Sequence, residues 1–177
     1  GIIAGGRTAL WSAVEGAEDD AAAGAAAIVN RGLTPQDILI GISASGSAPF
    51  LWGAMGEAHR IGSYTVLLTC HPGYREHPLP DKIIAVDTGP EVLTGSTRLR
   101  AGTATKLVLN CITTLAMAHS GKVIGNLMVD LNPSNTKLRH RAMGIVQTLS
   151  GCSEEQARAA LENHGWIVRD AIGSIPR

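Results

Sequence analysis

The sequence predicts an α/β protein with a mainly parallel sheet, and three observations lead to that fold class. Short apolar runs at residues 38–42, 64–69 and 82–87 have the length and the branched side chains of buried strands. Segments of helical length and amphipathic or alanine-rich pattern separate or follow these runs. A Ser- and Gly-rich loop comes directly after the first run. Strands that alternate with helices are joined by right-handed crossovers, so the strands are expected to lie parallel.

The composition is that of an ordinary folded globule. The 177 residues are 45% hydrophobic and 17% charged, and the formal net charge is +0. That balance gives no electrostatic reason to expect a nucleic acid or an anionic membrane as a partner. The 3 cysteines form no CxxC pair and no disulfide framework, so we expect a cytoplasmic location. We expect neither a signal peptide nor a membrane span.

The first elements are predicted to be a buried strand at residues 1–5 and a helix over residues 8–27. At helical spacing, Trp11, Val14 and Glu18 share one face of this helix. Burial of the two apolar side chains would desolvate Glu18 in part, which raises its pKa and suits it to proton transfer. A solvated acidic face is the alternative, because several neighbouring residues are also acidic.

The loop after the strand at residues 38–42 is the first dense chemical feature. It leads into a helix predicted over residues 50–61, and helix N-termini present N–H groups and a positive dipole end to anions. The residues expected to bind a phosphate group there are Ser43, Ser45, Gly46 and Ser47. The loop has neither a Walker lysine nor a GxGxxG frame, which favours a phosphate on a small molecule over a nucleotide. A plain turn between two elements is the alternative.

A second anion-facing helix start is predicted at residues 94–97, for a helix that runs to about residue 120. Arg98, Arg100 and Lys106 lie near this start, where cations oppose the helix dipole unless an anion binds. The alternative is a Ser/Thr cap with solvated arginines. The lower part of the helix is predicted to be core, through Leu107, Val108, Ile112 and Leu115.

The last part of the chain is predicted to be helical. One helix is expected from Asn132-Pro133 to about residue 149, and residues 123–131 have no clear assignment. Ser153 and Gln156 predict a capping box for a short helix over residues 154–163, with a further turn or two at residues 166–172. His71 and His77 are interpreted as loop residues, because no set of metal ligands surrounds them at suitable spacing.

Several stretches of the sequence are distinctive. They are VEGAEDD at residues 14–20, SASGSAPF at 43–50, EVLTGSTRLRAGTATKLVLN at 91–110, GKVIGNLMVDLNPSNTKL at 121–138 and GCSEEQARAAL at 151–161. Together they resemble the N-acetylmuramic acid 6-phosphate etherases, which are built on the sugar isomerase (SIS) domain. The mammalian glucokinase regulatory protein, which binds sugar phosphates without catalysis, shares much of this signature.

The resemblance implies a three-layer α/β/α SIS-type sugar-phosphate-binding domain over residues 1–131, incomplete at its N-terminus. Residues 132–177 would form a helical region with a tail like a ubiquitin-associated (UBA) domain. The implied reaction is cleavage of the ether between C3 of the sugar and D-lactate, which gives N-acetylglucosamine 6-phosphate. It needs no metal and no organic cofactor, and the family's SIS domains usually form homodimers.

The resemblance also implies roles for single residues. Glu18 matches the glutamate that abstracts the C2 proton of the sugar. The loop with Ser43, Ser45, Gly46 and Ser47, called the serine loop below, matches the sugar-phosphate loop of SIS domains. The family signature also places Ser96, Arg98 and Lys106 among the binding residues.

The sequence departs from the family in three ways. The family's second catalytic glutamate and its first strand belong to a segment upstream of Gly1. Ser47-Ala48 stands where the family usually has Arg-Thr, and Arg100 replaces a usual lysine. A non-catalytic sugar-phosphate-binding regulator, or an inactive truncated relative, is therefore the alternative to the lyase.

Overall fold

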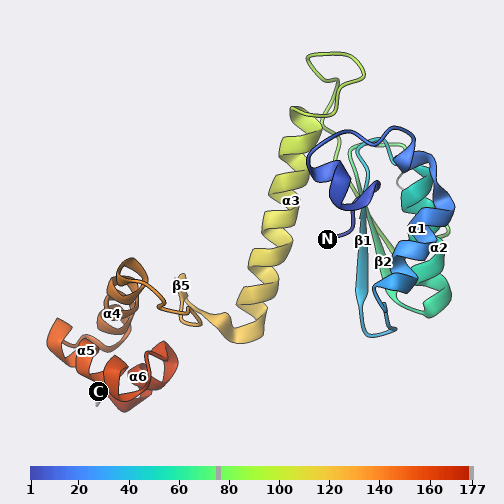
Figure 1. Cartoon of the computed structure of the whole chain (residues 1–177). Coiled ribbons are helices and arrows are strands. Elements are labelled where there is room, and N and C mark those ends of the chain that lie inside the picture. The colour runs from blue at the N-terminus through green and yellow to red at the C-terminus, as the bar shows by residue number, and fades with distance from the viewer. Residues whose placement is uncertain (75–76, 176–177) are drawn as a thin grey trace. The chain divides into compact units, whose positions relative to one another are not determined.

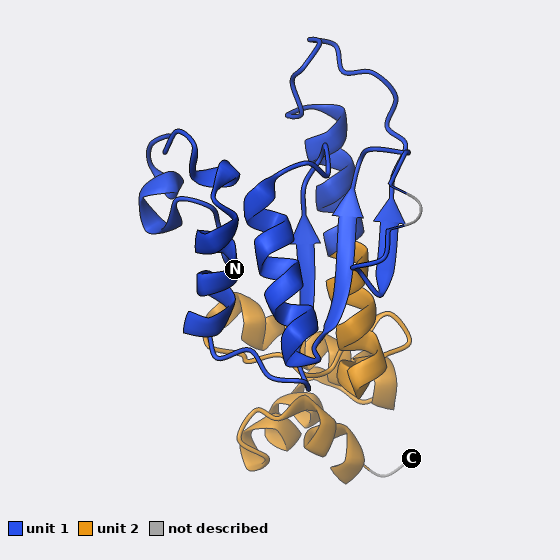
Figure 2. Ribbon diagram, turned by 90° about the vertical axis from the view of Figure 1, so that its right-hand side faces the viewer, with its two compact units in different colours: residues 1–109 blue, residues 110–177 orange. Residues whose placement is uncertain are grey.

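The computed structural model describes residues 1–74 and 77–175, and the chain divides into two compact units, Gly1–Leu109 and Asn110–Arg177 (Figure 2). Each unit has a hydrophobic core of its own. The predicted boundary after residue 131 lies inside the second unit.

The first unit is built on a three-stranded parallel sheet in the order β1-β2-β3 (Figure 1). The strands are β1 (Ile38–Ile42), β2 (Tyr64–Thr69) and β3 (Lys82–Ala85). In the register, Ile40 lies opposite Val66 and Leu68 lies opposite Ile84. The α/β class and the parallel sheet are confirmed, and β3 ends two residues before the predicted end.

Two helices cover one face of this sheet. They are α1 (Ala21–Asn30) and α2 (Pro49–Ile61), and α2 contacts both β1 and β2. Leu51 and Met55 of α2 pack in one buried cluster with Leu67 of β2. On the other face of β1, Ile38 is 63% exposed and Ile42 is 46% exposed. The expectation that this run forms a buried strand is therefore wrong for this face.

α1 and α2 approach each other closely at two glycines. A Cβ added to Gly24 of α1 would lie 2.0 Å from the carbonyl oxygen of Phe50. One added to Gly53 of α2 would lie 1.9 Å from the carbonyl oxygen of Ala21. Only glycine at these positions lets the two backbones touch, which sets the distance between the helices.

The predicted strand at residues 1–5 is wrong, and the helix predicted over residues 8–27 is confirmed only from Ala21 onward. Residues 1–5 form no strand, and two short 3₁₀ turns, Gly6–Leu10 and Ala17–Asp19, precede α1. Gly16 has a left-handed backbone (φ 73°), which interrupts any continuous helix. Asp20 then caps α1, because its side chain accepts a hydrogen bond from the N–H of Ala23 at 2.8 Å.

α3 (Arg100–Met117) begins later than predicted and is followed by a π-helical turn, Ala118–Lys122. Leu107 and Leu115 are each 58% exposed, so the prediction that they belong to the core is wrong. Within the described residues, no helix combines the length and the apolar character that a membrane span requires.

After the end of α3 and the π-helical turn, the described residues of the second unit form a short antiparallel hairpin and three helices. The elements are β4 (Val123–Ile124), β5 (Leu127–Met128), α4 (Thr136–Ser150), α5 (Glu154–Asn163) and α6 (Val168–Ser174). Val146, Leu161 and Val168, one from each helix, are almost fully buried in one core. Side chains of Ser153 and Gln156 form the predicted capping box of α5. The three predicted helices are present, but α4 begins at Thr136, after the predicted start at Asn132-Pro133.

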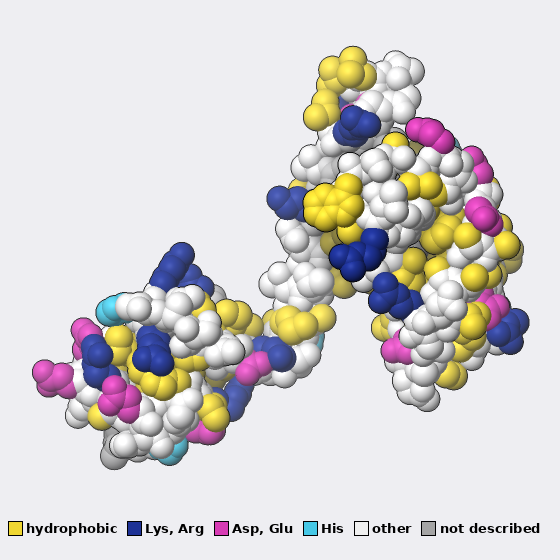
Figure 3. Space-filling view, in the orientation of Figure 1, with side chains coloured by type: hydrophobic (Ala, Val, Ile, Leu, Met, Phe, Trp, Pro, Cys, Tyr) yellow, Lys and Arg dark blue, Asp and Glu magenta, His cyan; other side chains and the backbone are white. Residues whose placement is uncertain are grey.

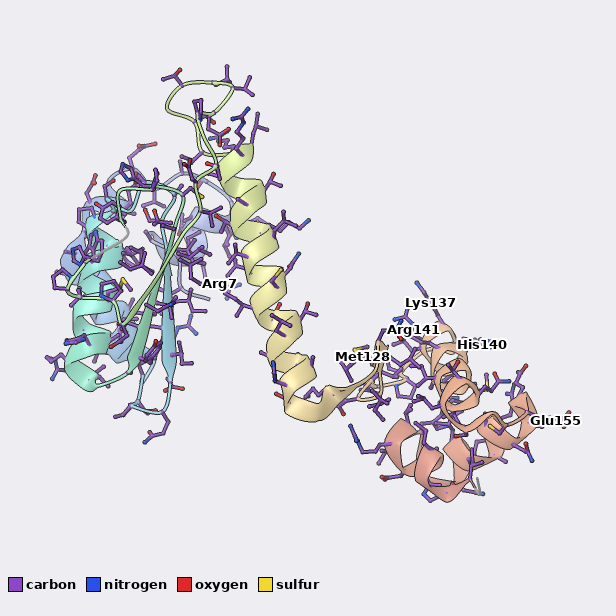
Figure 4. All side chains as sticks on the ribbon, turned by 180° about the vertical axis from the view of Figure 1, so that it is seen from behind. Arg7, Met128, Lys137, His140, Arg141 and Glu155 are labelled. Atoms are coloured by element: carbon purple, nitrogen blue, oxygen red, sulfur yellow. The ribbon has the colours of Figure 1, made fainter. Side chains whose placement is uncertain are left out.

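The basic side chains of α4 lie on its solvent-exposed side. Lys137, His140 and Arg141 are exposed and project from the helix (Figure 4). The guanidinium group of Arg139 lies 4.8 Å from the ring centre of Trp166, which is a cation–π distance.

Candidate functional site

The serine loop lies at the carboxyl end of β1, where it leads into α2. The N–H of Ser43 donates to the carbonyl of Leu68 at 3.1 Å, so the β1–β2 ladder continues to the first residue of the loop. The hydroxyl of Ser43 accepts the N–H of Gly46 at 3.1 Å, and Gly46 has φ 75°. This local bond closes the turn that a left-handed glycine permits.

The hydroxyl groups of Ser45 and Ser47 lie together at the exposed side of the loop. Their Oγ atoms are 2.8 Å apart, and the N–H of Ser47 points to Ser45 Oγ at 3.3 Å. At the start of α2, Ala48 occupies the capping position and no side chain caps the helix. Two hydroxyls and an uncapped helix N-terminus therefore face the same region, which is the arrangement that an anion needs.

Two carbonyl groups of the loop, those of Ala44 and Gly46, accept hydrogen bonds from the neighbouring scaffold. Thr69 Oγ1 donates to the carbonyl of Ala44 at 3.1 Å, and the N–H of Cys70 donates to the same oxygen at 3.0 Å. Trp52 Nε1 donates to the carbonyl of Gly46 at 2.8 Å. These two carbonyl oxygens are therefore engaged by donors of the scaffold.

Two aromatic residues that sequence reasoning missed hold the loop from behind. Gly46 is buried, and a Cβ added to it would lie 2.7 Å from the ring of Tyr74. Trp52 contacts the same residue through its indole N–H. A tryptophan one turn into the helix after a predicted anion loop was the available signal, in a chain with only 3% aromatic residues.

Glu18 is exposed, and so are Trp11 and Val14, which are 85% and 40% exposed. The predicted burial of Glu18 is therefore wrong, because the three residues do not share a helix. The 3₁₀ turn that carries Glu18 nevertheless contacts α2. Ala21, three residues further on, lies against Gly53 of the same helix. The fold thus brings the segment of Glu18 to the helix that the serine loop precedes.

The prediction of an anion-facing helix start at residues 94–97 is wrong: the helix begins at a later residue, and a carboxylate of the protein itself binds its N-terminus. α3 begins at Arg100, and the carboxylate of Glu91 accepts hydrogen bonds from the N–H groups of Arg100 (3.1 Å) and Ala101 (3.0 Å). The bond from Ala101, followed by that from Arg100, lowers the pKa of the Glu91 carboxyl below its ordinary value. A side chain of the protein already occupies this helix N-terminus.

Ser96, Arg98 and Lys106 belong to the same unit as the serine loop. Ser96 is half-buried in the segment before α3, and its N–H donates to the carbonyl of Leu93 at 3.0 Å. Arg98 and Lys106 are exposed. The apolar side chains of Val92 and Leu93 are 73% and 68% exposed at the tip of this segment, where Figure 3 shows apolar surface.

α3 is tied to the end of β2 near the serine loop. The thiol of Cys70 lies 3.7 Å from the carbonyl oxygen of Ala101 and 3.8 Å from the hydroxyl of Thr105. Because the N–H of Cys70 also donates to Ala44, this residue links the first turns of α3 to the loop.

A separate cleft of about 820 Å³ lies between the N-terminal segment and α1. Arg7, Arg31 and Phe50 are among its lining residues, and none of the predicted site residues lines it.

His71 and His77 are in loops, as the sequence predicts. The Nδ1 atom of His71 accepts the N–H of Gly73 at 3.0 Å, and the Nδ1 atom of His77 accepts the N–H of Leu79 at 3.2 Å. In the part of the chain that the structure describes, no group of three or more His, Cys, Asp or Glu is placed to hold a metal ion.

Comparison with known proteins matches both units to one group. Residues 1–59 match the N-terminal SIS domain of glucokinase regulatory protein, and residues 125–164 match the C-terminal lid domain of the same protein. The parallel sheet with its serine loop is thus that of an α/β protein with a SIS domain.

Curated relatives named N-acetylmuramic acid 6-phosphate etherase match almost the whole chain. The relative from Jannaschia sp. is 48% identical over 97% of the chain, and that from Gloeobacter violaceus is 51% identical over 97%. The relative from Escherichia coli is 48% identical over 91%. The chain belongs to the N-acetylmuramic acid 6-phosphate etherase family. It spans about half the length of these relatives, between 54% and 56%.

Proposed function

We propose that the protein containing this chain is a cytoplasmic lyase that cleaves the lactyl ether of N-acetylmuramic acid 6-phosphate. The products are N-acetylglucosamine 6-phosphate and D-lactate, a step of peptidoglycan and amino-sugar catabolism. One observation carries the proposal: the serine loop presents Ser45 and Ser47 at an uncapped helix N-terminus, with its carbonyls of Ala44 and Gly46 engaged behind. The names of the relatives support the choice of the sugar phosphate.

In this proposal the serine loop holds the phosphate group. Ser43, Ser45 and Ser47 donate through their hydroxyls, and Gly46 allows the backbone to come close to the ligand. Ser96, Arg98 and Lys106 add hydroxyl and positive charge from the segment around the start of α3. Residues 1–131 would be the sugar-phosphate-binding domain and residues 132–177 the helical region.

The chemical step begins at C2 of the open-chain sugar. The carboxylate of Glu18 takes the C2 proton, and the electron pair forms a C2–C3 double bond as the C3–O bond breaks. The lactate oxygen takes up a proton from the family's second glutamate, which lies outside these residues. Water then adds to C3 and gives up a proton to the second glutamate, and Glu18 returns its proton to C2. In total, one N-acetylmuramic acid 6-phosphate and one water give one N-acetylglucosamine 6-phosphate and one D-lactate. The proposed step uses no metal and no organic cofactor.

The first experiment is a thermal melt of the 177-residue chain with and without N-acetylmuramic acid 6-phosphate. A ligand that binds only the native state raises the midpoint, so a clear upward shift is expected. A cooperative melt without a shift would overturn the proposed binding function. N-acetylmuramic acid without the phosphate is the matched control ligand.

The role of Glu18 is tested in the full-length protein by isotope exchange. Glu18→Gln is expected to abolish entry of solvent deuterium at C2, whereas Glu15→Gln, an exchange at another exposed glutamate, is expected to leave it unchanged. Deuterium entry at the unaltered rate in Glu18→Gln would show that another residue is the base.

A non-catalytic sugar-phosphate-binding regulator is the second candidate function. The match of both units to domains of glucokinase regulatory protein favours it, and so does the exposure of Glu18. The two candidates differ in one measurement, because only the lyase releases D-lactate from a bound substrate.

We propose in addition that the protein is a homodimer. β1 pairs with β2 alone among the described strands, and Ile38 and Ile42 are exposed on its open face, so apolar surface is available for a second copy. Sedimentation at micromolar concentration is expected to give the dimer mass, and a monomer would contradict this part of the proposal.

A further inference from the structure

Trp52 lies in the first turn of α2 and reaches back to the loop that precedes the helix. Its indole N–H donates to the carbonyl of Gly46 at 2.8 Å, in a half-buried position. This bond connects two residues six positions apart, and no other hydrogen bond to the Gly46 carbonyl is seen among the described residues. The carbonyl is therefore directed to the helix side of the loop.

The indole is held in place by rings from the segment after β2. The imidazole of His77 stacks on Trp52 with ring centres 4.3 Å apart and planes at 24°. Tyr74 lies 6.0 Å from Trp52 and fills the space beside Gly46. Because an offset stack fixes the plane of the indole, the direction of its N–H is fixed as well.

The direction of the Gly46 carbonyl determines the direction of the next amide. The C=O of Gly46 and the N–H of Ser47 share one planar trans peptide, so they point to opposite sides. No cis peptide occurs in the chain as described. The N–H of Ser47 does point away from Trp52, to Ser45 Oγ at 3.3 Å, where the two serine hydroxyls lie. A weak bond of this length is easily exchanged for one to a charged oxygen.

We propose that Trp52 is a positioning residue, which holds the Gly46–Ser47 peptide with its N–H toward a bound phosphate oxygen. The inference rests on the proposed function, because it takes the serine loop as the phosphate site. Without the indole N–H, the peptide can rotate and present the Gly46 carbonyl to the anion, which repels it. Trp52 touches no substrate and acts through the backbone of the loop alone.

The variant Trp52→Phe removes the N–H and keeps an aromatic ring in the stack. Its affinity for N-acetylmuramic acid 6-phosphate, measured by calorimetry, is expected to fall about tenfold, which corresponds to about 1.4 kcal/mol. Trp11→Phe, at a residue that is 85% exposed, is the matched control and is expected to bind normally. Equal affinity of Trp52→Phe and the unaltered chain would overturn the inference and leave the proposed function intact.

A second measurement needs no variant and covers the case in which Trp52→Phe does not fold. The chain has 3 tryptophans, so the unaltered, ¹⁵N-labelled protein gives one indole N–H signal for each. Saturation with the sugar phosphate is expected to shift the Trp52 signal more than those of Trp11 and Trp166. Binding with an unmoved Trp52 signal would overturn the inference, whereas absence of binding in the melt would overturn the proposed function and the inference together.

Discussion

The carboxylate of Glu91 accepts the backbone N–H of Ala101 at 3.0 Å and thereby closes the segment that precedes α3 onto the start of the helix. Its other oxygen accepts the N–H of Arg100 at 3.1 Å. Glu91, ten positions before Ala101, thus caps the N-terminus of α3, and its negative charge neutralises the positive end of the helix dipole. The segment with Ser96 and Arg98 is held between these two points.

The first prediction concerns acid stability. Because the pKa of Glu91 is lowered in the folded chain, its stabilising effect is complete above the ordinary value of 4.5 and is lost as the pH falls through the lowered value. Glu91→Gln keeps one acceptor and loses the charge, so it should lower the unfolding midpoint at neutral pH. It should also flatten the loss of stability below about pH 4.5, measured by urea unfolding across the acid range.

Glu155→Gln is the control for this experiment. Glu155 is exposed in the first turn of α5, and the exchange is chemically the same (Figure 4). If the free energy of unfolding falls as steeply with decreasing pH in Glu91→Gln as in Glu155→Gln, a stabilising role of the Glu91 cap is contradicted.

The second prediction concerns the contact between α1 and α2. Gly53→Ala places a methyl group within 1.9 Å of the carbonyl oxygen of Ala21, and a backbone atom has no rotamer through which to yield. Overpacking of this kind costs about 1–3 kcal/mol or more, so we expect a loss of at least about 2 kcal/mol of unfolding free energy.

Gly56→Ala, in the same helix, is the matched control. No atom lies within 4 Å of a Cβ added at Gly56, so the alanine should stabilise the helix by about 0.5–1 kcal/mol. The two variants should therefore move the denaturant midpoint in opposite directions. Equal shifts would show that the glycine contact does not hold in solution.

The third prediction concerns the open start of α2. Ala48 has the extended backbone of a capping residue (φ −62°, ψ 117°) but no side chain that accepts a hydrogen bond. Ala48→Thr should stabilise the chain by about 1 kcal/mol in a thermal melt. Ala48→Val, which has the same shape without the hydroxyl, should give no such gain, and a gain from both variants would point to packing instead.

The fourth prediction concerns the charge of the serine loop. The resemblance to the etherases places Ser47 where that family usually has arginine, and the Ser47 side chain is exposed. Ser47→Arg should tighten binding of N-acetylmuramic acid 6-phosphate about tenfold, because a hydrogen bond to a charged group contributes about 1.5–3 kcal/mol. The gain should shrink with added salt. Ser47→Gln offers a long polar side chain without charge, and an equal gain from it would argue against an electrostatic cause.

Sequence patterns located the elements whose signals are local. The strands β1 and β2 follow from their branched apolar runs, and α5 follows from the capping box of Ser153 and Gln156. The serine loop was found for the same reason, because its residues are consecutive. Pro49 at the first position of α2 marks where the loop ends.

The failures have local and tertiary causes. Helical spacing predicts a buried Glu18, and this fails because Gly16 and the Asp20 cap divide that segment. The cap of α3 depends on tertiary structure, since no local pattern connects Glu91 to Ala101. The bond from Trp52 to Gly46 depends on the path of the loop backbone, which a side-chain pattern does not encode.

The two glycines between α1 and α2 also limit how this chain can diverge. At most core positions, a larger residue on one element is accommodated when a neighbouring side chain becomes smaller. Gly24 and Gly53 each face main-chain atoms of the opposite helix, which no substitution can shrink. No second-site change in a side chain would rescue a replacement at either position. We therefore expect these two sites to drift far less than their apolar neighbours, although they contribute no side chain to core or site.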